Sequence, residues 1–163
     1  MPKKPRGFEV IGDEQIKKDF KKFTIIDEPE IKIPKRKTAL SAGHDVYTPF
    51  DIKLRPGEDI NIPTGLKSYM KADEVLFAYP RSGIGLDYYV RFANTTPVID
   101  ADYYNNPKNE GHIFLKIRNE SKRDLFIEKG DRFAQFVFQN YLLADGESFE
   151  GEERKGGFGH TDE

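Results

Sequence analysis

The sequence has no cysteine and only three histidines among its 163 residues. The missing cysteines exclude disulfides, thiolate nucleophiles and zinc–thiolate centres, and no two histidines have the spacing of a metal-ligand pair. Long apolar runs and an apolar N-terminal leader are also missing, so neither a membrane span nor a secretory signal is predicted. We therefore expect a cytoplasmic protein.

A strong charge of one sign is missing as well. Lysine and arginine number 26 and the acidic residues 28, which gives a net charge of −2. Such a balance produces no overall field that would favour nucleic acid or a membrane surface. We expect neither as a partner.

The composition that is present indicates one all-β domain spanning residues 1–163. Aromatic residues make up 13% of the chain, and 14 glycines and 10 prolines separate short apolar runs, as in domains with many strands and turns. A short amphipathic helix is predicted over Asp13–Phe23, with Asp13 as its N-cap, inside a variable segment 1–33. Residues 145–163 are acidic and glycine-rich, and we expect them to form a mobile C-terminal arm.

Alternating apolar residues predict the strands. The predicted strands are Phe8–Ile11, Phe50–Leu54, Asp59–Ile62, Leu66–Met70, Glu74–Tyr79, Leu86–Ala93, a strand containing Ile113, Leu115 and Ile117, a strand containing Leu125 and Ile127, and Arg132–Tyr141. Val98–Tyr104 is predicted to be one arm of a β-hairpin, because turn-forming residues follow it from Asn105 to Gly111. That hairpin places carboxylates beside aromatic rings, which suits a small polar ligand with a flat part, although a solvated acidic hairpin has the same pattern.

Two further stretches have the composition of anion-binding segments. Pro80–Gly85 offers glycine backbone, a hydroxyl and a guanidinium, although ordinary loops often have this composition. The tail combines Arg154, Lys155, three glycines and the ring of Phe158, and it could close over an anionic, ring-bearing ligand. A disordered terminus is the alternative for that tail.

Five separated stretches carry these features in order: AGHDVYTP (42–49), PRSGIG (80–85), NTTPVIDADY (94–103), GDRFAQ (130–135) and RKGGFGHT (154–161). In this order and spacing they closely resemble the five motifs of the homotrimeric all-β dUTPase family. The insertion YYNNPKNEGHI is similar to members from Gram-positive bacteria and their phages. The resemblance implies a distorted jelly-roll β-barrel, a homotrimer with shared active sites, and Mg²⁺-dependent hydrolysis of dUTP to dUMP and pyrophosphate.

The resemblance also implies roles for the third motif. Asp100 would contact the sugar 3′-hydroxyl and orient or deprotonate the water that attacks the α-phosphorus. Tyr103 would pack on the deoxyribose and leave no room for a 2′-hydroxyl. Asn94 and the backbone around Val98 and Ile99 would recognise the uracil edge.

The other motifs imply contacts with the triphosphate. Arg81, Ser82 and Gly83 match phosphate-binding positions, and Gln135 matches a glutamine near the α-phosphate. Asp45 matches an aspartate near the water ligands of Mg²⁺, an ion held mainly by phosphates and water rather than by side chains. Five further matches lie in the C-terminal stretch. They are Phe158 as the ring over uracil, and Arg154, Gly159, His160 and Thr161 around the β- and γ-phosphates.

Some positions depart from the family pattern. Pro97 replaces a common glycine, so a backbone contact that needs an unusual φ there is in doubt. Arg154 lies one residue closer to Phe158 than usual, so its role could pass to Lys155. Asp162 and Glu163 place acid near the phosphate clamp.

Two other functions remain as alternatives. The related dCTP deaminases need an acid on the strand after the central hairpin, and HIFLKIRN has none, since Glu110 lies in the preceding loop. A dUTPase-like module that senses nucleotide or binds a protein with little turnover is the runner-up. Retention of Ser82, Asp100, Gln135 and Phe158 argues against an idle site.

Overall fold

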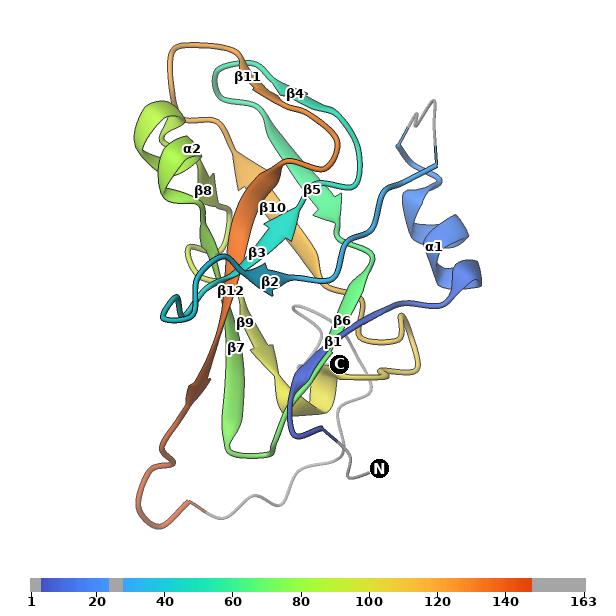
Figure 1. Ribbon diagram of the computed structural model, residues 1–163, viewed down its shortest axis with the longest axis vertical. Coiled ribbons are helices and arrows are strands. Elements are labelled where there is room, and N and C mark those ends of the chain that lie inside the picture. Colours follow the sequence, from blue (N-terminus) through green and yellow to red (C-terminus); the bar gives the residue numbers. More distant parts are fainter. Residues whose placement is uncertain (1–3, 24–27, 148–163) are drawn as a thin grey trace.

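The computed structural model describes residues 4–23 and 28–147, and their fold is built mainly from antiparallel strands (Figure 1). The first half contains β1 (Gly7–Val10), α1 (Asp13–Phe20), β2 (Lys35–Arg36), β3 (His44–Tyr47), β4 (Ile52–Leu54), β5 (Asp59–Pro63), β6 (Leu66–Tyr69) and β7 (Glu74–Pro80). The second half contains α2 (Ser82–Tyr88), β8 (Arg91–Phe92), β9 (Val98–Asp100), the 3₁₀ helix η1 (Ala101–Tyr103), β10 (Phe114–Arg118), β11 (Leu125–Ile127) and β12 (Arg132–Asn140). The expected all-β class is confirmed.

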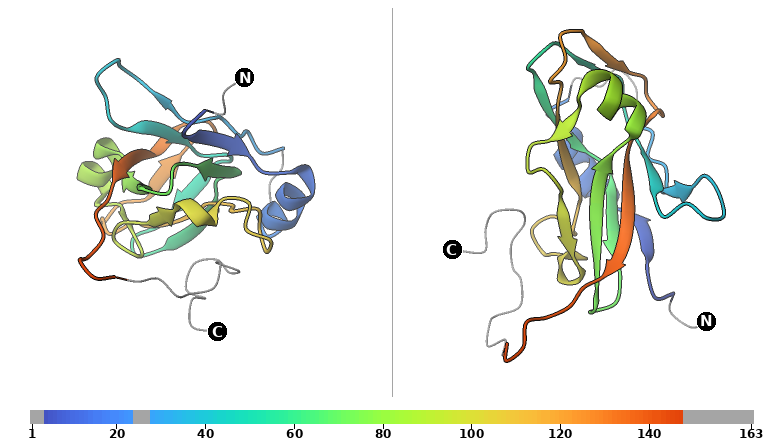
Figure 2. Two further views of the ribbon diagram at one scale, coloured as in Figure 1. Left: turned by 90° about the horizontal axis from the view of Figure 1, so that it is seen from below. Right: turned by 90° about the vertical axis from the view of Figure 1, so that its left-hand side faces the viewer.

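The strands form four antiparallel sheets. The largest has the order β2-β3-β12-β7-β9, and the others are β5-β10-β8, β1-β6 and β4-β11. Figure 2 shows β7 and β12, the longest strands, running side by side through the molecule. Neighbours in each sheet are often distant in sequence, so the chain crosses repeatedly between sheets.

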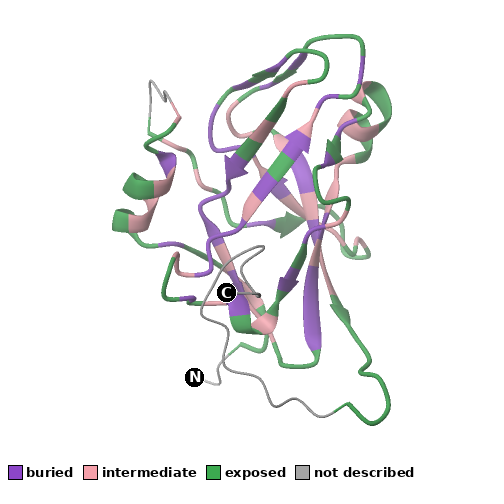
Figure 3. Cartoon of the chain, turned by 180° about the vertical axis from the view of Figure 1, so that it is seen from behind, coloured by how far each residue is buried: buried purple, intermediate pink, exposed green. Residues whose placement is uncertain are grey.

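The predicted alternation places the core correctly around Leu115, but not in β12, where a register shift buries both Phe133 and Ala134. Ile113, Leu115 and Ile117 are fully buried, as are Phe133 and Phe136 on β12. These residues belong to one cluster of buried side chains. Figure 3 colours the buried residues of the described chain purple. In the described part of the chain no helix is long and apolar enough to span a membrane.

The segment after β7 differs from the prediction. We expected a loop at Pro80–Gly85 followed by a strand over Leu86–Ala93, but Ser82–Tyr88 is helical and only Arg91–Phe92 is a strand. The apolar side chain of Leu86 is exposed on that helix. The strand pattern was therefore misleading, because it counted an exposed helical leucine as a buried strand residue.

The predicted hairpin at Val98–Tyr104 is also wrong. Only Val98–Asp100 is a strand, and it pairs with β7, whereas the strand after the loop pairs with β5 and β8. A 3₁₀ turn follows Asp100. Turn residues predicted a reversal of the chain, but local sequence did not specify which strands would pair.

The N-terminal helix is present but shorter than predicted. It ends at Phe20 rather than Phe23, and Gly12, not Asp13, is its N-cap. Asp13 is the first helical residue and places a negative charge in the first turn, which is favourable there. Of the expected mobile arm, residues 148–163 lie outside the described part.

Candidate functional site

Asp45 is the centre of a charged cluster at one end of the largest sheet. Its Oδ2 lies 3.1 Å from Nη1 of Arg132, and its Oδ1 lies 3.8 Å from Nε of Arg81. The Asp45 side chain is only 15% exposed, whereas the two arginines are more open to solvent. The carboxylate therefore orients two guanidinium groups that remain accessible to an anion.

Arg132 is a member of this cluster that the sequence analysis missed. It lies in the stretch GDRFAQ, three residues before Gln135. The chain irregularity between Arg132 and Ala134 places Arg132 opposite Tyr47 on β3 and brings its side chain to Asp45. The sequence feature that could have identified Arg132 is its place in GDRFAQ, the stretch already singled out for Gln135.

Gln135 joins the same cluster through strand register. It pairs with Asp45 on β3 and with Tyr79 on β7. A Cβ added to Gly43 would lie 2.2 Å from the Gln135 Oε1, so a larger residue at position 43 would displace this amide. Asp45 and Gln135, predicted from separate stretches, are thus brought together.

Ser82 and Gly83 begin α2 next to the Asp45 cluster. The first backbone hydrogen bond of this helix joins the Gly85 N–H to the Arg81 carbonyl, so the preceding N–H groups are not used within the helix. Both Ser82 and Gly83 are exposed, and a Cβ on Gly83 would meet no atom within 4 Å. This end of α2 is open to a ligand or to a neighbouring chain.

The third-motif residues form a second group on β9. Asp100 and Val98 are exposed, whereas Ile99 is buried in the core. The Pro97 carbonyl accepts a hydrogen bond from the Ala78 N–H of β7. Because backbone groups alternate sides along an antiparallel strand, the Val98 N–H and C=O point away from β7. They can therefore face a ligand at the edge of the sheet.

Asn94 and Tyr103 flank this group. Asn94 is exposed in a tight turn closed by the Thr95 N–H to Phe92 carbonyl bond. Tyr103 is 3% exposed, and its hydroxyl donates to the His112 carbonyl at 2.8 Å. Only a small part of the Tyr103 ring remains for contact with a ligand.

The two groups lie far apart within one chain. Asp100 pairs with Val75 near one end of β7, and Gln135 pairs with Tyr79 near the other end. This difference corresponds to about 13 Å along the strand, and β9 and β12 flank β7 on opposite sides. Figure 1 shows the same separation, with α2 at one end of the molecule and η1 at the other.

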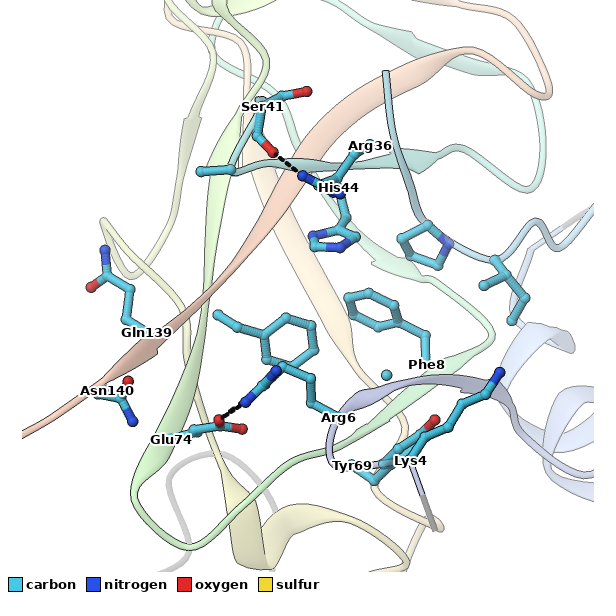
Figure 4. A pocket seen from close by; sticks show the side chains of 15 residues that line it. Lys4, Arg6, Phe8, Arg36, Ser41, His44, Tyr69, Glu74, Gln139 and Asn140 are labelled. Carbon is cyan, nitrogen blue, oxygen red and sulfur yellow. Dashed lines mark hydrogen bonds and ion pairs between the residues drawn. The ribbon is translucent and has the colours of Figure 1, made fainter. Parts of the chain in front are cut away.

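A cavity of about 700 Å³ lies on a different face and contains none of the predicted site residues (Figure 4). Its wall includes His44, which precedes Asp45 and so points to the opposite face of β3. Burial lowers the pKa of His44. Arg6 pairs with Glu74, and Arg36 donates to the carbonyls of Ala39 and Ser41. Both guanidinium groups are therefore committed to partners within the chain.

Residues 4–23 and 28–147 contain no group of three histidine or acidic side chains that could hold a metal ion. Each Asp45 oxygen already faces a guanidinium. Asp45 therefore suits a Mg²⁺ that is held by substrate phosphates and water, with the carboxylate acting through a water ligand. Arg154, Phe158, Gly159, His160 and Thr161 lie outside the described residues.

Comparison with known proteins identifies the family. A family model described as dUTPase matches residues 29–162. A deoxyuridine 5'-triphosphate nucleotidohydrolase from Lactococcus lactis is 46% identical over 159 residues, covering 97% of this chain and 98% of the relative.

Solved structures agree with this match. A dUTPase from Streptococcus mutans has a TM-score of 0.67 at 37% identity, covering 86% of this chain and 99% of that chain. A dUTPase from phage phi11 of S. aureus, at 18% identity and a TM-score of 0.65, shares the fold over 92% of this chain and 99% of its own. The predicted dUTPase-type barrel and the likeness to Gram-positive and phage proteins are thereby confirmed. The chain belongs to the dUTPase family.

Proposed function

We propose that this protein is a dUTP diphosphatase that hydrolyses dUTP to dUMP and pyrophosphate, which keeps uracil out of DNA and supplies dUMP. The observation that carries the proposal is the family match over residues 29–162, together with 46% identity to a dUTP nucleotidohydrolase along nearly the whole chain. The positions of Asp45, Asp100 and Gln135 supply groups suited to this reaction.

The β9 group is proposed to bind the nucleoside. The outward N–H and C=O of Val98 form a fixed donor–acceptor pair that can match the uracil edge, supported by Asn94, whereas the Ile99 backbone groups face β7 by the same alternation. Asp100 would accept a hydrogen bond from the 3′-hydroxyl and a proton from the attacking water. The covered Tyr103 ring would limit the space beside C2′ of the sugar.

The Asp45 cluster is proposed to bind the triphosphate. Arg81 and the exposed start of α2 at Ser82 and Gly83 would contact phosphate oxygens, and Gln135 would donate near the α-phosphate. When bound with the substrate, Mg²⁺ supplies neutralisation of phosphate charge. A dUTPase mutant of phage phi11, which shares the fold at 17% identity, is described with a structural Mg(II) ion.

The separation of the two groups supports a homotrimer with shared active sites. Both Asp100 and Gln135 are proposed to act at the α-phosphate, but within one chain they pair with residues near opposite ends of β7, too far apart to reach one phosphate together. A neighbouring chain can supply the missing half. The C-terminal residues around Phe158, with Arg154 or Lys155, are proposed to close over the bound nucleotide. We propose a cytoplasmic location.

Deamination of dCTP is disfavoured by the contacts of Glu110. Its carboxylate accepts from the Gly12 N–H at 3.0 Å and lies 3.3 Å from Nζ of Lys67, and these contacts lower its pKa. A proton shuttle beside the base needs a carboxyl group whose pKa is raised towards neutrality. Glu110 instead anchors the N-terminal segment.

The proposal is tested by incubating dUTP, dCTP, dTTP and UTP with the protein and Mg²⁺ and measuring pyrophosphate, orthophosphate and ammonia. We expect pyrophosphate from dUTP, and its loss in Asp100→Asn but not in the nearby matched variant Asp102→Asn. Binding of dUTP without turnover would support a nucleotide sensor instead. Ammonia from dCTP would make the protein a deaminase.

A further inference from the structure

The N-terminal segment is attached to the loop 104–112 by three side-chain contacts. The Tyr104 hydroxyl donates to Oε2 of Glu9 at 2.6 Å, and the Gly12 N–H donates to Glu110. At the end of α1, Asp19 Oδ2 lies 2.6 Å from Nδ1 of His112. Figures 1 and 2 show α1 beside this loop. The two segments are distant in sequence, since Asp19 and His112 are 93 residues apart.

His112 is the buried end of the third contact. Its side chain is 0% exposed, and its ring packs against Phe20 of α1 and against Phe114. The Gly65 N–H donates to Nε2 at 2.8 Å, so Nε2 has no proton and Nδ1 donates to Asp19. Both ring nitrogens are thus used, and the imidazole is fixed in one tautomer and one orientation.

The backbone of His112 connects this contact to the segment that carries Asp100 and Tyr103. Its carbonyl accepts from the Tyr103 hydroxyl at 2.8 Å, and Asn109 Nδ2 donates to the same hydroxyl at 2.8 Å. Tyr103 ends η1, three residues after Asp100. A continuous chain of hydrogen bonds and packed rings therefore runs from α1 to the segment that carries Asp100 and Tyr103.

We propose that Asp19 and His112 are positioning residues that fix the Tyr103 ring, and with it Asp100, against the nucleotide sugar. This inference rests on the proposed function. Neither residue contacts the substrate in this arrangement. Their effect comes through the Tyr103 hydroxyl. This hydroxyl holds the ring so close to the bound sugar that a deoxyribose fits and the 2′-hydroxyl of a ribose does not.

The test compares Asp19→Ala, which removes the acceptor, with Asp19→Asn, which keeps an oxygen acceptor for the Nδ1 proton. Asp13→Ala, an exposed acid on the same helix, is the control. We expect Asp19→Ala to lower the ratio of kcat/KM for dUTP over UTP by about tenfold, because small displacements of bound groups have effects of this order. Asp19→Asn and Asp13→Ala should stay within about twofold of the unaltered protein.

A double-mutant cycle decides whether the effect passes through Tyr103. Tyr103→Phe keeps the ring and removes the hydroxyl, with its hydrogen bond from Asn109 and its contact with the His112 carbonyl. If Asp19 acts through that contact, Asp19→Ala combined with Tyr103→Phe should lose no more selectivity than the larger single change. If the losses of selectivity in Asp19→Ala and Tyr103→Phe multiply in the double variant, the inference is overturned. A lower melting temperature of Asp19→Ala with unchanged selectivity would also overturn it.

Hydrogen exchange separates this inference from the proposed function. In Asp19→Ala we expect faster exchange in residues 98–112 but not in β10, whether or not dUTP is present. If the unaltered protein does not hydrolyse dUTP, the proposed function fails. If it does hydrolyse dUTP while Asp19→Ala keeps full selectivity and normal exchange, only the positioning role fails.

Discussion

At the scale of single residues, the arrangement around Asp45 explains how one carboxylate can serve an anion-binding site. It neutralises part of the charge of Arg81 and Arg132 and fixes their directions. Asp45 and Gln135 were predicted through the family resemblance, because both lie in stretches that match its motifs. Arg132 was not, because its contact with Asp45 depends on strand pairing that no local pattern shows.

Arg132→Ala should lower kcat/KM for dUTP by about tenfold, which corresponds to about 1.4 kcal/mol of lost transition-state stabilisation. Without Arg132, the remaining ionic partner of Asp45 among the described residues is Arg81, and Asp45 draws it away from the phosphates. Steady-state kinetics measure this effect, with Arg55→Ala in the exposed turn before β5 as the control. An Arg132→Ala enzyme with unchanged kcat/KM would show that Asp45 does not need this partner.

Because the His112 side chain is buried, we expect the protein to lose stability in mild acid. Burial lowers its pKa below the ordinary value of 6.5, although Asp19 and Glu110 oppose this shift. The unfolded chain then binds the proton more readily, so stability is complete above about pH 6.5 and falls below it, by up to about 1.4 kcal/mol per pH unit for one proton.

Chemical unfolding between pH 8 and pH 5 measures this slope. Burial also lowers the pKa of His44, so His44 contributes a slope of the same sign. We expect His112→Gln to flatten the curve more than the matched change His44→Gln, because His112 is fully buried and His44 is not. An equally steep curve in His112→Gln would contradict the assigned protonation state.

At the scale of elements, alternation predicted β10 and β11 because each buries every second side chain, as Leu115 and Ile117 show. Alternation fits β12 less well, because Phe133 and Ala134 are buried in succession at the register shift of that strand. It failed at α2, where Leu86 is exposed on a short helix. It also failed to pair β9 with β7, because partner choice depends on the whole sheet. Local patterns therefore did not predict the elements that carry several of the proposed site residues.

Gly111 makes the contact between the loop and Tyr103 possible. It has φ of 77°, and an added Cβ would lie 2.3 Å from the Tyr103 carbonyl oxygen. Gly146 has nearly the same φ, 76°, but no atom within 4 Å of an added Cβ.

Gly111→Ala should reduce the free energy of unfolding by more than about 2 kcal/mol, whereas Gly146→Ala should cost about 1 kcal/mol or less. Urea unfolding of the two variants isolates the cost of the close contact from that of backbone strain. Equal destabilisation would mean that the loop can move away from Tyr103 at no cost.

At the scale of the whole molecule, the sequence suggested a trimer only through family resemblance. The structure favours sites shared between chains, since Asp100 and Gln135 pair with residues near opposite ends of β7. We expect a mass in solution of three times the 18.8 kDa of one chain, measured by light scattering.

Subunit mixing tests whether the sites are shared. Asp100→Asn and Gln135→Ala should each be inactive alone. After the chains exchange, about a quarter of the sites should combine an intact β9 group from one chain with an intact Asp45 cluster from another. Activity that does not return, although mixed trimers form, would place both groups in a site within one chain.

The most direct test of the account is hydrolysis of dUTP in ¹⁸O-labelled water, with mass spectrometry of both products. Asp100 is proposed to activate water for attack on the α-phosphorus, so each turnover should place one labelled oxygen in dUMP and none in pyrophosphate. Label in pyrophosphate would move the attack to the β-phosphorus and away from Asp100. No labelled product from either half of the nucleotide would contradict the proposed hydrolysis altogether.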